Sequence, residues 1–180
     1  AALLGASATL EIASNDPDEN PYLLYLSGTG VLPGRPDYTF VPEVTGTAVY
    51  ALAKQPDGKI IIGGNFTSIN GQVRNHIARL HPDGTLEGTN TFNAGTGASA
   101  QVNCIALQPD GKIIIGGNFT SINGQARNRI ARLHPDGTLE STTTFNPGSG
   151  LNSSVYAIVV QPDGRIIVGG AFTSVNSQSR

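Results

Sequence analysis

Apolar residues in this chain recur in short blocks separated by turn residues, and the whole pattern repeats every 53 residues. The segment QPDGKIIIGGNFTSINGQ at 55–72 returns unchanged at 108–125, and a third copy begins at Gln161. A period of this length is typical of β-propeller blades and similar arrays. Helical repeats need apolar positions at a spacing of 3.6 residues, which this sequence lacks. The pattern therefore predicts an all-β repeat protein.

Within one repeat, the alternation of apolar and turn residues predicts four antiparallel strands joined by two PDG hairpins and a longer middle connection. The PDG at 56–58 has proline, aspartate and glycine in the order that suits a tight turn. Three consecutive isoleucines at 60–62 predict a strand covered on both faces. Gly63 and Gly64 are expected to end it, where another backbone approaches closely. The predicted strands are 48–54, 59–66, 76–81 and 85–92.

These phrases resemble the delta-60 repeat, a propeller-type repeat of large bacterial surface and secreted proteins. Matching copies begin with VYALAKQPDGK (49–59) and VNCIALQPDGK (102–112), and a third, VYAIVVQPDGR (155–165), breaks off after its second strand. The resemblance implies a partial β-propeller of four-stranded antiparallel blades over 38–180, about two and a half blades in all. It also implies an extracellular or cell-surface location, and it supplies no catalytic residues.

The beginning of the chain follows a different pattern. ATLEIASNDPDENPYLLYLSGTG (8–30) resembles the closing strands of immunoglobulin-like sandwich modules of the ASPM/SPD-2/Hydin type, and its alternation around an acidic turn predicts a hairpin. We expect a remnant of an immunoglobulin-like β-sandwich over 1–30, a linker over 31–37 and propeller repeats over 38–180. YTFVPEVTGTA (38–48) matches TFNAGTG of the repeat and is expected to supply an outer strand of a preceding blade.

Both ends of the sequence look cut, because the sandwich begins near its finish and the last blade lacks its third and fourth strands. The chain is either a fragment of a longer protein or is completed by strands from neighbouring copies, and the fragment is favoured. Since a blade buries its faces only against its neighbours, we expect the isolated chain to expose its end blades and to associate.

Charge and cysteine content exclude several classes of partner. The net charge is −2 and the 11 basic residues are scattered singly, so we expect no nucleic-acid binding. No run of 18 apolar residues is present, so we expect no membrane insertion in this segment. Cys104 is the single cysteine, and Ala51 and Ala157 hold its position in the other copies. It is interpreted as a small buried residue.

The carboxylates and histidines do not form a catalytic pattern. Five of the eight aspartates lie in PDG turns. His81 and His134 are equivalent positions one blade apart, and Arg129 replaces His76 in the next copy. A catalytic group should occur once in the chain, and no residue that differs between the copies offers one. We therefore interpret the protein as non-enzymatic, with no catalytic or cofactor-binding residue.

Two candidate binding sites remain. NDPDEN (15–20) offers Asp16, Asp18 and Glu19, whose hard oxygen donors suit Ca²⁺, although a solvated turn is the favoured interpretation. The repeated connection NFTSINGQ provides polar side chains for glycan or protein contacts. These are Thr67, Ser68, Asn70, Gln72 and Arg74 in one copy, and Thr120, Ser121, Asn123, Gln125 and Arg127 in the next.

The leading functional hypothesis is a non-enzymatic extracellular structural or adhesive repeat module of a large bacterial surface or secreted protein. Its partners would be neighbouring domains, copies of the same protein, glycans or surface proteins. The alternative is a carbohydrate- or protein-binding β-propeller that uses the repeated loops between strands. A glycosidase or lyase is the least favoured, because such enzymes need two carboxylates that face each other across a substrate.

Overall fold

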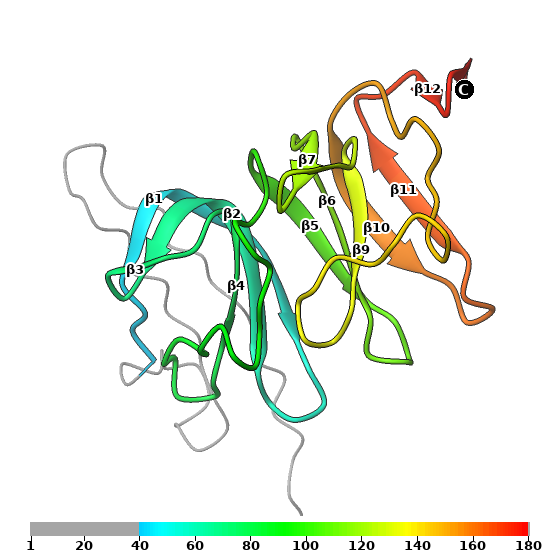
Figure 1. Cartoon of the computed structure of the whole chain (residues 1–180). Coiled ribbons are helices and arrows are strands. Elements are labelled where there is room, and N and C mark those ends of the chain that lie inside the picture. Colours follow the sequence, from blue (N-terminus) through cyan, green and yellow to red (C-terminus); the bar gives the residue numbers. More distant parts are fainter. Residues whose placement is uncertain (1–39, 180) are drawn as a thin grey trace, which may run out of the picture.

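The computed structural model describes residues 40–179 of the chain. Every regular element in this part is a β-strand, which confirms the all-β prediction. Figure 1 shows three main sheets side by side in the order of the sequence. The predicted immunoglobulin-like remnant (1–30) and linker (31–37) lie outside the described residues, so both stay predictions.

The first repeat forms one sheet, which we call unit 1. Strand β2 is central: it pairs antiparallel with β1 along its length, with β4 along its first part and with the short β3 at its end. Its strands are β1 (Val44–Lys54), β2 (Ile60–Ile69), β3 (Gln72–Val73) and β4 (Ile77–Leu80).

Unit 2 repeats this arrangement with shorter strands, and unit 3 repeats the first strand pair and the short hairpin. In unit 2, β6 pairs with β5 and β9, and β7 and β8 form a separate hairpin. In unit 3, β10 pairs with β11, and β12 with β13. The strands of unit 2 are β5 (Val102–Leu107), β6 (Ile113–Gly117), β7 (Ser121–Ile122), β8 (Gln125–Ala126) and β9 (Ile130–Leu133). Those of unit 3 are β10 (Val155–Val160), β11 (Ile166–Gly170), β12 (Ser174–Val175) and β13 (Gln178–Ser179).

The PDG segments form the predicted tight turns. Between β1 and β2, Gly58 has a φ of 87°, which a glycine adopts without steric cost. The Asp57 carboxylate accepts a hydrogen bond of 3.1 Å from the backbone N–H of Lys59, and the Gly58 N–H donates to the Gln55 carbonyl. The other PDG aspartates accept the same backbone bond two residues on, so the structural interpretation of these five aspartates is confirmed.

The predicted fourth strand of each blade is not confirmed. Only an isolated bridge joins Leu86 to Leu80 in unit 1. The chain then turns, because the N–H groups of Thr91 and Phe92 both donate to the carbonyl of Gly88. Leu139 and Leu133 form the same single bridge in unit 2. Residues 85–92 therefore form an irregular segment that turns Glu87 and Phe92 inward, since a β-ladder would continue the pairing beyond this single bridge.

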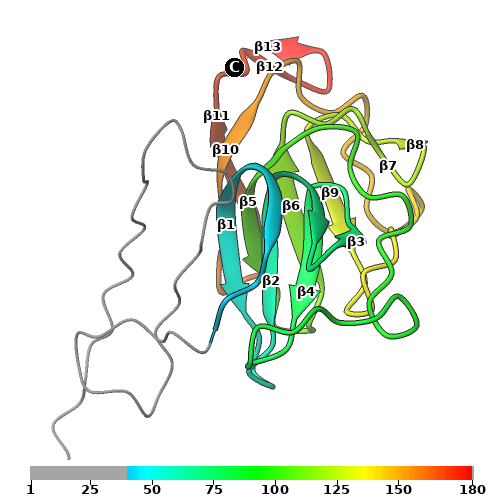
Figure 2. The same cartoon turned by 90° about the vertical axis from the view of Figure 1, so that its left-hand side faces the viewer.

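The three units stack face to face, and the consecutive isoleucines of the central strand serve both faces. We call the face toward the next unit the trailing face and the opposite one the leading face. Ile61 packs into the core shared with Val102 and Ile115 of unit 2, whereas Ile62 packs with Phe40 on the leading face. The inner strands β1, β5 and β10 follow one behind another in Figure 2. This explains why the block of isoleucines is apolar at every position.

Glycines at the end of this block admit the neighbouring unit. A Cβ on Gly63 would lie 2.7 Å from Cγ1 of Val102, and one on Gly116 would lie 2.6 Å from Cγ1 of Val155. Gly64 instead faces the backbone of Ala48 in its own sheet. Close approach was thus predicted correctly. The expected strand end was wrong for unit 1, because β2 continues to Ile69.

The segment before β1 occupies the place of the connection between units. The ring of Phe40 lies 3.2 Å from the site of a Cβ on Gly84, and Phe92 lies 3.0 Å from the equivalent site on Gly137. The predicted match between the segment before β1 and the repeated TFNAGTG segment is therefore seen in the packing of Phe40 and Phe92. An outer strand is not: residues 40–42 are irregular, and the Phe92 segment is irregular too.

Candidate functional site

The NFTSINGQ segment of units 1 and 2 and the equivalent AFTSVNSQ (171–178) of unit 3 each fold back as a short hairpin. Their turn residues have left-handed backbone conformations, with φ of 49° at Asn70, 47° at Asn123 and 50° at Asn176. Asparagine followed by glycine is the preferred pair for a two-residue turn in which both φ angles are positive. The sequence Asn70–Gly71 therefore forms the turn that its composition predicts.

Each turn asparagine anchors its hairpin to the segment that precedes the unit. The backbone N–H of Asn123 donates to the Gly97 carbonyl at 2.8 Å, and its Oδ1 accepts from the Thr96 N–H at 3.1 Å. Asn176 repeats both bonds with Gly150 and Ser149. Asn70 makes the equivalent pair with Glu43, in which its Oδ1 accepts from the Glu43 N–H at 2.7 Å. These side-chain oxygens hold the hairpins in place.

The ten predicted contact residues lie on these hairpins and differ in their accessibility. The threonines, asparagines and glutamines are exposed, the two serines are half-buried, and Arg74 is half-buried. Arg127 is buried, and its Nε has no hydrogen-bond partner among the described residues. A role of these residues in binding stays a prediction.

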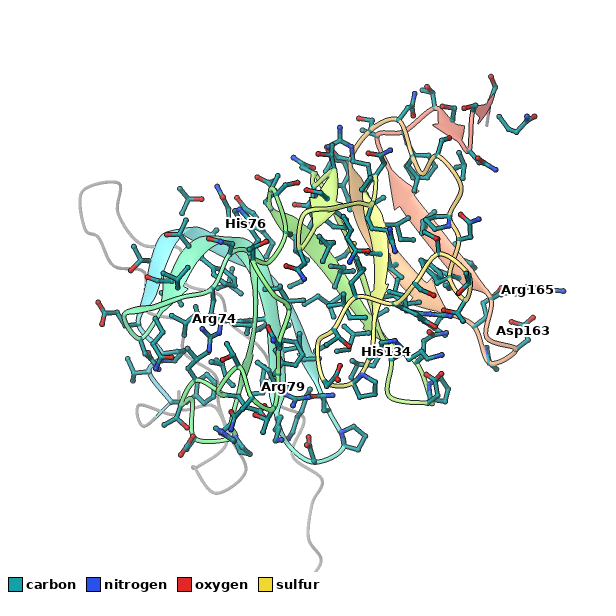
Figure 3. All side chains as sticks on the ribbon, in the orientation of Figure 1. Arg74, His76, Arg79, His134, Asp163 and Arg165 are labelled. Atoms are coloured by element: carbon teal, nitrogen blue, oxygen red, sulfur yellow. The ribbon has the colours of Figure 1, made fainter. Side chains whose placement is uncertain are left out.

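A surface cavity of about 270 Å³ lies beside Arg74. The Arg74 guanidinium forms part of the cavity wall. Two hydrogen bonds fix its position: Nη1 donates to the Val73 carbonyl at 2.8 Å, and Nη2 donates to the Glu87 carbonyl at 3.2 Å. Figure 3 shows Arg74 between His76 at the upper end of unit 1 and Arg79 toward its lower end. The lining residues are Val73, Arg74, Asn75, Ile77, Thr89, Phe92, Asn93, Ala94, Gly95, Thr96 and Gly97.

A second cavity, of about 250 Å³, lies between units 2 and 3. Arg129 contributes its charge there, and the equivalent position in unit 1 holds His76. Burial lowers the pKa of His76, and its Nδ1 lies 3.2 Å from the Gly64 carbonyl. The lining residues are Asn128, Arg129, Ser149, Gly150, Leu151, Asn152, Ser174 and Ser177. Polar side chains therefore make up most of the wall of this second cavity.

A buried ionic cluster in each of the first two units is the feature that sequence analysis missed. Arg79 makes a two-pronged contact to the Glu87 carboxylate, and Lys59 approaches the same carboxylate at 3.0 Å. Arg79 also donates to the Pro135 carbonyl of unit 2 at 2.7 Å and stacks over Phe92 at 4.6 Å. The cluster therefore ties strands of one unit together and joins that unit to the next.

Unit 2 repeats this cluster with Arg132, Glu140 and Lys112. Burial alone would raise the pKa of Glu87, but hydrogen bonds from Arg79 and Lys59 overcome this and lower it to about 2. The hydrogen bonds from Arg132 lower the pKa of Glu140 to about 2 against the opposing effect of burial. The signal for this cluster was present in the sequence as lysine, arginine and glutamate repeated at 53-residue spacing.

The remaining candidates are the thiol of Cys104 and the possible metal ligands. Cys104 is half-buried, and burial raises the pKa of its thiol to about 11. No group of three or more His, Cys, Asp or Glu that could hold a metal occurs among the described residues 40–179. The calcium candidates Asp16, Asp18 and Glu19 lie outside them. Within 40–179, no helix is long and apolar enough to cross a membrane.

Comparison with known proteins identifies a family. A family model described as "Domain of unknown function (DUF5122) beta-propeller" matches residues 55–89, 108–142 and 161–180, which together make up half of the chain. No curated protein matches this sequence. The matched segments begin at the PDG turn of each unit and include the central strand. The chain therefore belongs to the DUF5122 β-propeller family.

Proposed function

We propose that the chain is a non-enzymatic structural and adhesive module of a large bacterial surface or secreted protein, built from propeller repeats of the delta-60 type. The observation that carries this proposal is the repetition of one arrangement: units 1 and 2 each bury an apolar face against the following unit, and all three units carry a similar polar hairpin. The central glycines of units 1 and 2 meet valines of the following unit. Such an array extends a binding surface with each added repeat.

The ionic groups support a structural role for the charged residues. Glu87 and Glu140 are buried against arginines of their own units, and with a pKa of about 2 they stay ionised at neutral pH. A general acid or base needs a pKa nearer to the working pH. The clusters are therefore suited to holding the sheets together.

The location can be tested on cells of the source bacterium. Antibodies raised against the chain are expected to label intact cells or to detect the protein in the culture medium. Beads coated with the chain should then adhere to surfaces carrying the natural partner, and beads coated with heat-denatured chain serve as the control. Labelling that appears only after permeabilisation, with none in the medium, would refute the surface location.

A second candidate function is carbohydrate or protein binding through the repeated hairpins. The cavity beside Arg74 favours it, because a fixed guanidinium, Asn75, Thr89 and Asn93 surround a space of about 270 Å³. Binding sites of this kind combine a concave surface with a few placed polar groups. On a glycan array, wild type is expected to bind a defined set of sugars, and Thr89→Arg, which fills this cavity, is expected to bind them more weakly. Thr142→Arg changes the equivalent residue of unit 2 and serves as the matched control.

A further inference from the structure

The cavity beside Arg74 has a positive charge in its wall, and no acidic residue occurs among the described residues that line it. Arg74 makes no ion pair with any described residue. The nearby Glu87 carboxylate pairs with Arg79 and Lys59 instead, and Arg74 is hydrogen-bonded only to the backbone carbonyl of Glu87. An unbalanced positive charge beside a hollow in the surface attracts an anion.

The Arg74 guanidinium is held in a form that suits a carboxylate. Its bonds to two backbone carbonyls leave its other N–H groups without a partner among the described residues. A guanidinium carries its N–H groups in a planar fork, which matches the two oxygens of a carboxylate. Because the fork is already fixed by the protein, a carboxylate binds it with little further loss of side-chain freedom.

The neutral polar groups of the cavity wall suit the hydroxyl groups of a sugar. Nδ2 of Asn75 donates to the Thr96 carbonyl, and Oδ1 of Asn93 accepts from the Gly95 N–H, so both side chains are held in place. Oδ1 of Asn75, Nδ2 of Asn93 and the Thr89 hydroxyl make no hydrogen bond to a described residue. The wall therefore offers both donors and acceptors to hydroxyl groups, which are themselves donors and acceptors.

The apolar part of the wall suits the C–H groups of a sugar ring. Ile77 and Phe92 line the cavity and are buried, whereas Val73 is 71% exposed. Val73 is the most exposed of the large apolar side chains in the described part of the chain. Amide, hydroxyl and apolar groups around one positive charge match a sugar ring that carries a carboxylate.

The equivalent arginine of unit 2 is less accessible. Arg127 makes the same two bonds to backbone carbonyls as Arg74, but it is only 7% exposed. Ala126 replaces Val73 in unit 2, and Pro147 replaces Ala94. The bonds that hold the arginine are thus common to both units, while the accessible arginine and the exposed valine belong to unit 1.

We propose that the cavity beside Arg74 binds a uronic acid unit of an acidic polysaccharide. The carboxylate of the sugar pairs with Arg74, its hydroxyl groups bond to Asn75, Asn93 and Thr89, and its C–H face packs against Val73. This inference rests on the carbohydrate-binding function proposed above and adds the class of sugar.

The test measures binding of the purified chain by calorimetry to oligosaccharides of galacturonic, glucuronic, mannuronic and guluronic acid, each beside its methyl ester. The ester keeps the ring and its hydroxyl groups and removes the charge. At least one acid is expected to bind, and its ester is expected to bind about 10- to 100-fold more weakly, the range for loss of a charged hydrogen bond. Neutral and sulfated oligosaccharides and an acidic peptide complete the set of ligands.

Variants at an exposed residue keep the test independent of folding, which circular dichroism verifies. Val73→Glu adds a negative charge near Arg74 and is expected to bind the acid about 10-fold more weakly than Val73→Gln, which has the same size without the charge. Ala126→Glu, at the equivalent exposed residue of unit 2, is the matched control and should bind the acid like wild type. Arg74→Lys keeps the charge but loses the fork, and it is expected to weaken binding about 10-fold.

Equal affinity for an acid and its ester would overturn the proposal, and so would an Ala126→Glu effect as large as that of Val73→Glu. Binding of neutral or sulfated sugars without any uronic acid would overturn it and leave carbohydrate binding itself standing. If the acidic peptide binds and no sugar does, or if nothing binds, both the carbohydrate function and this inference are wrong.

Discussion

Replacing Glu87 by glutamine removes the negative charge from the buried ionic cluster of unit 1 and keeps the size of the side chain. Arg79 and Lys59 then lose the carboxylate that both contact, and the Arg79 side chain stays in a position where it is only 8% exposed. A buried charge that loses its partner destabilises a protein more than a surface pair would. The free energy of unfolding is therefore expected to fall.

The size of the effect follows from the pKa of Glu87, which the folded protein lowers from 4.5 to about 2. A difference of this size corresponds to about 3 kcal/mol, since each pKa unit is worth about 1.4 kcal/mol. Because the folded-state pKa is depressed, this stability is fully present above about pH 5. It is lost as the pH falls from 4.5 toward 2, where the unfolded chain binds a proton before the folded chain does.

Urea unfolding of wild type and Glu87→Gln, followed by circular dichroism, measures this difference at pH 7 and at steps down to pH 2.5. Glu43→Gln, at an exposed position, is the control and should change stability by less than about 0.5 kcal/mol. Glu140→Gln should cost less than Glu87→Gln, because Arg132 is more exposed than Arg79. A gap between wild type and Glu87→Gln that is below 0.5 kcal/mol, or that does not shrink as the pH falls, would refute the assignment.

Three further predictions concern packing, turns and the thiol. Gly63→Val should lower the free energy of unfolding by about 1–3 kcal/mol in thermal or urea melts, because its Cβ would lie 2.7 Å from Val102; an unchanged melting temperature contradicts this. Asn123→Ala should cost about 1–2 kcal/mol by the same measurement, since it loses a side-chain hydrogen bond and places alanine at a φ of 47°; stability equal to wild type contradicts this. Burial raises the pKa of Cys104 to about 11, so alkylation by iodoacetamide at pH 8 should be on the order of 100-fold faster in denaturant than in the folded chain; equal rates contradict this.

Local features of the fold could be predicted from the sequence because their causes lie within a few neighbouring residues. The PDG and Asn70–Gly71 turns need only the conformational preferences of proline, aspartate, asparagine and glycine. The block of isoleucines at 60–62 reveals a strand covered on both faces for a similar reason, since side chains alternate along a strand. The 53-residue period then makes every unit alike.

The sequence by itself therefore determined the repeat, its turns and the doubly covered central strand. The tertiary structure decided which inward side chains meet. Glu87 turns toward Arg79 and Lys59, and the predicted fourth strand gives way to an irregular segment. Asn123 accepts a hydrogen bond from the connection before its unit. These outcomes depend on contacts between residues distant in the chain, and local preferences do not encode them.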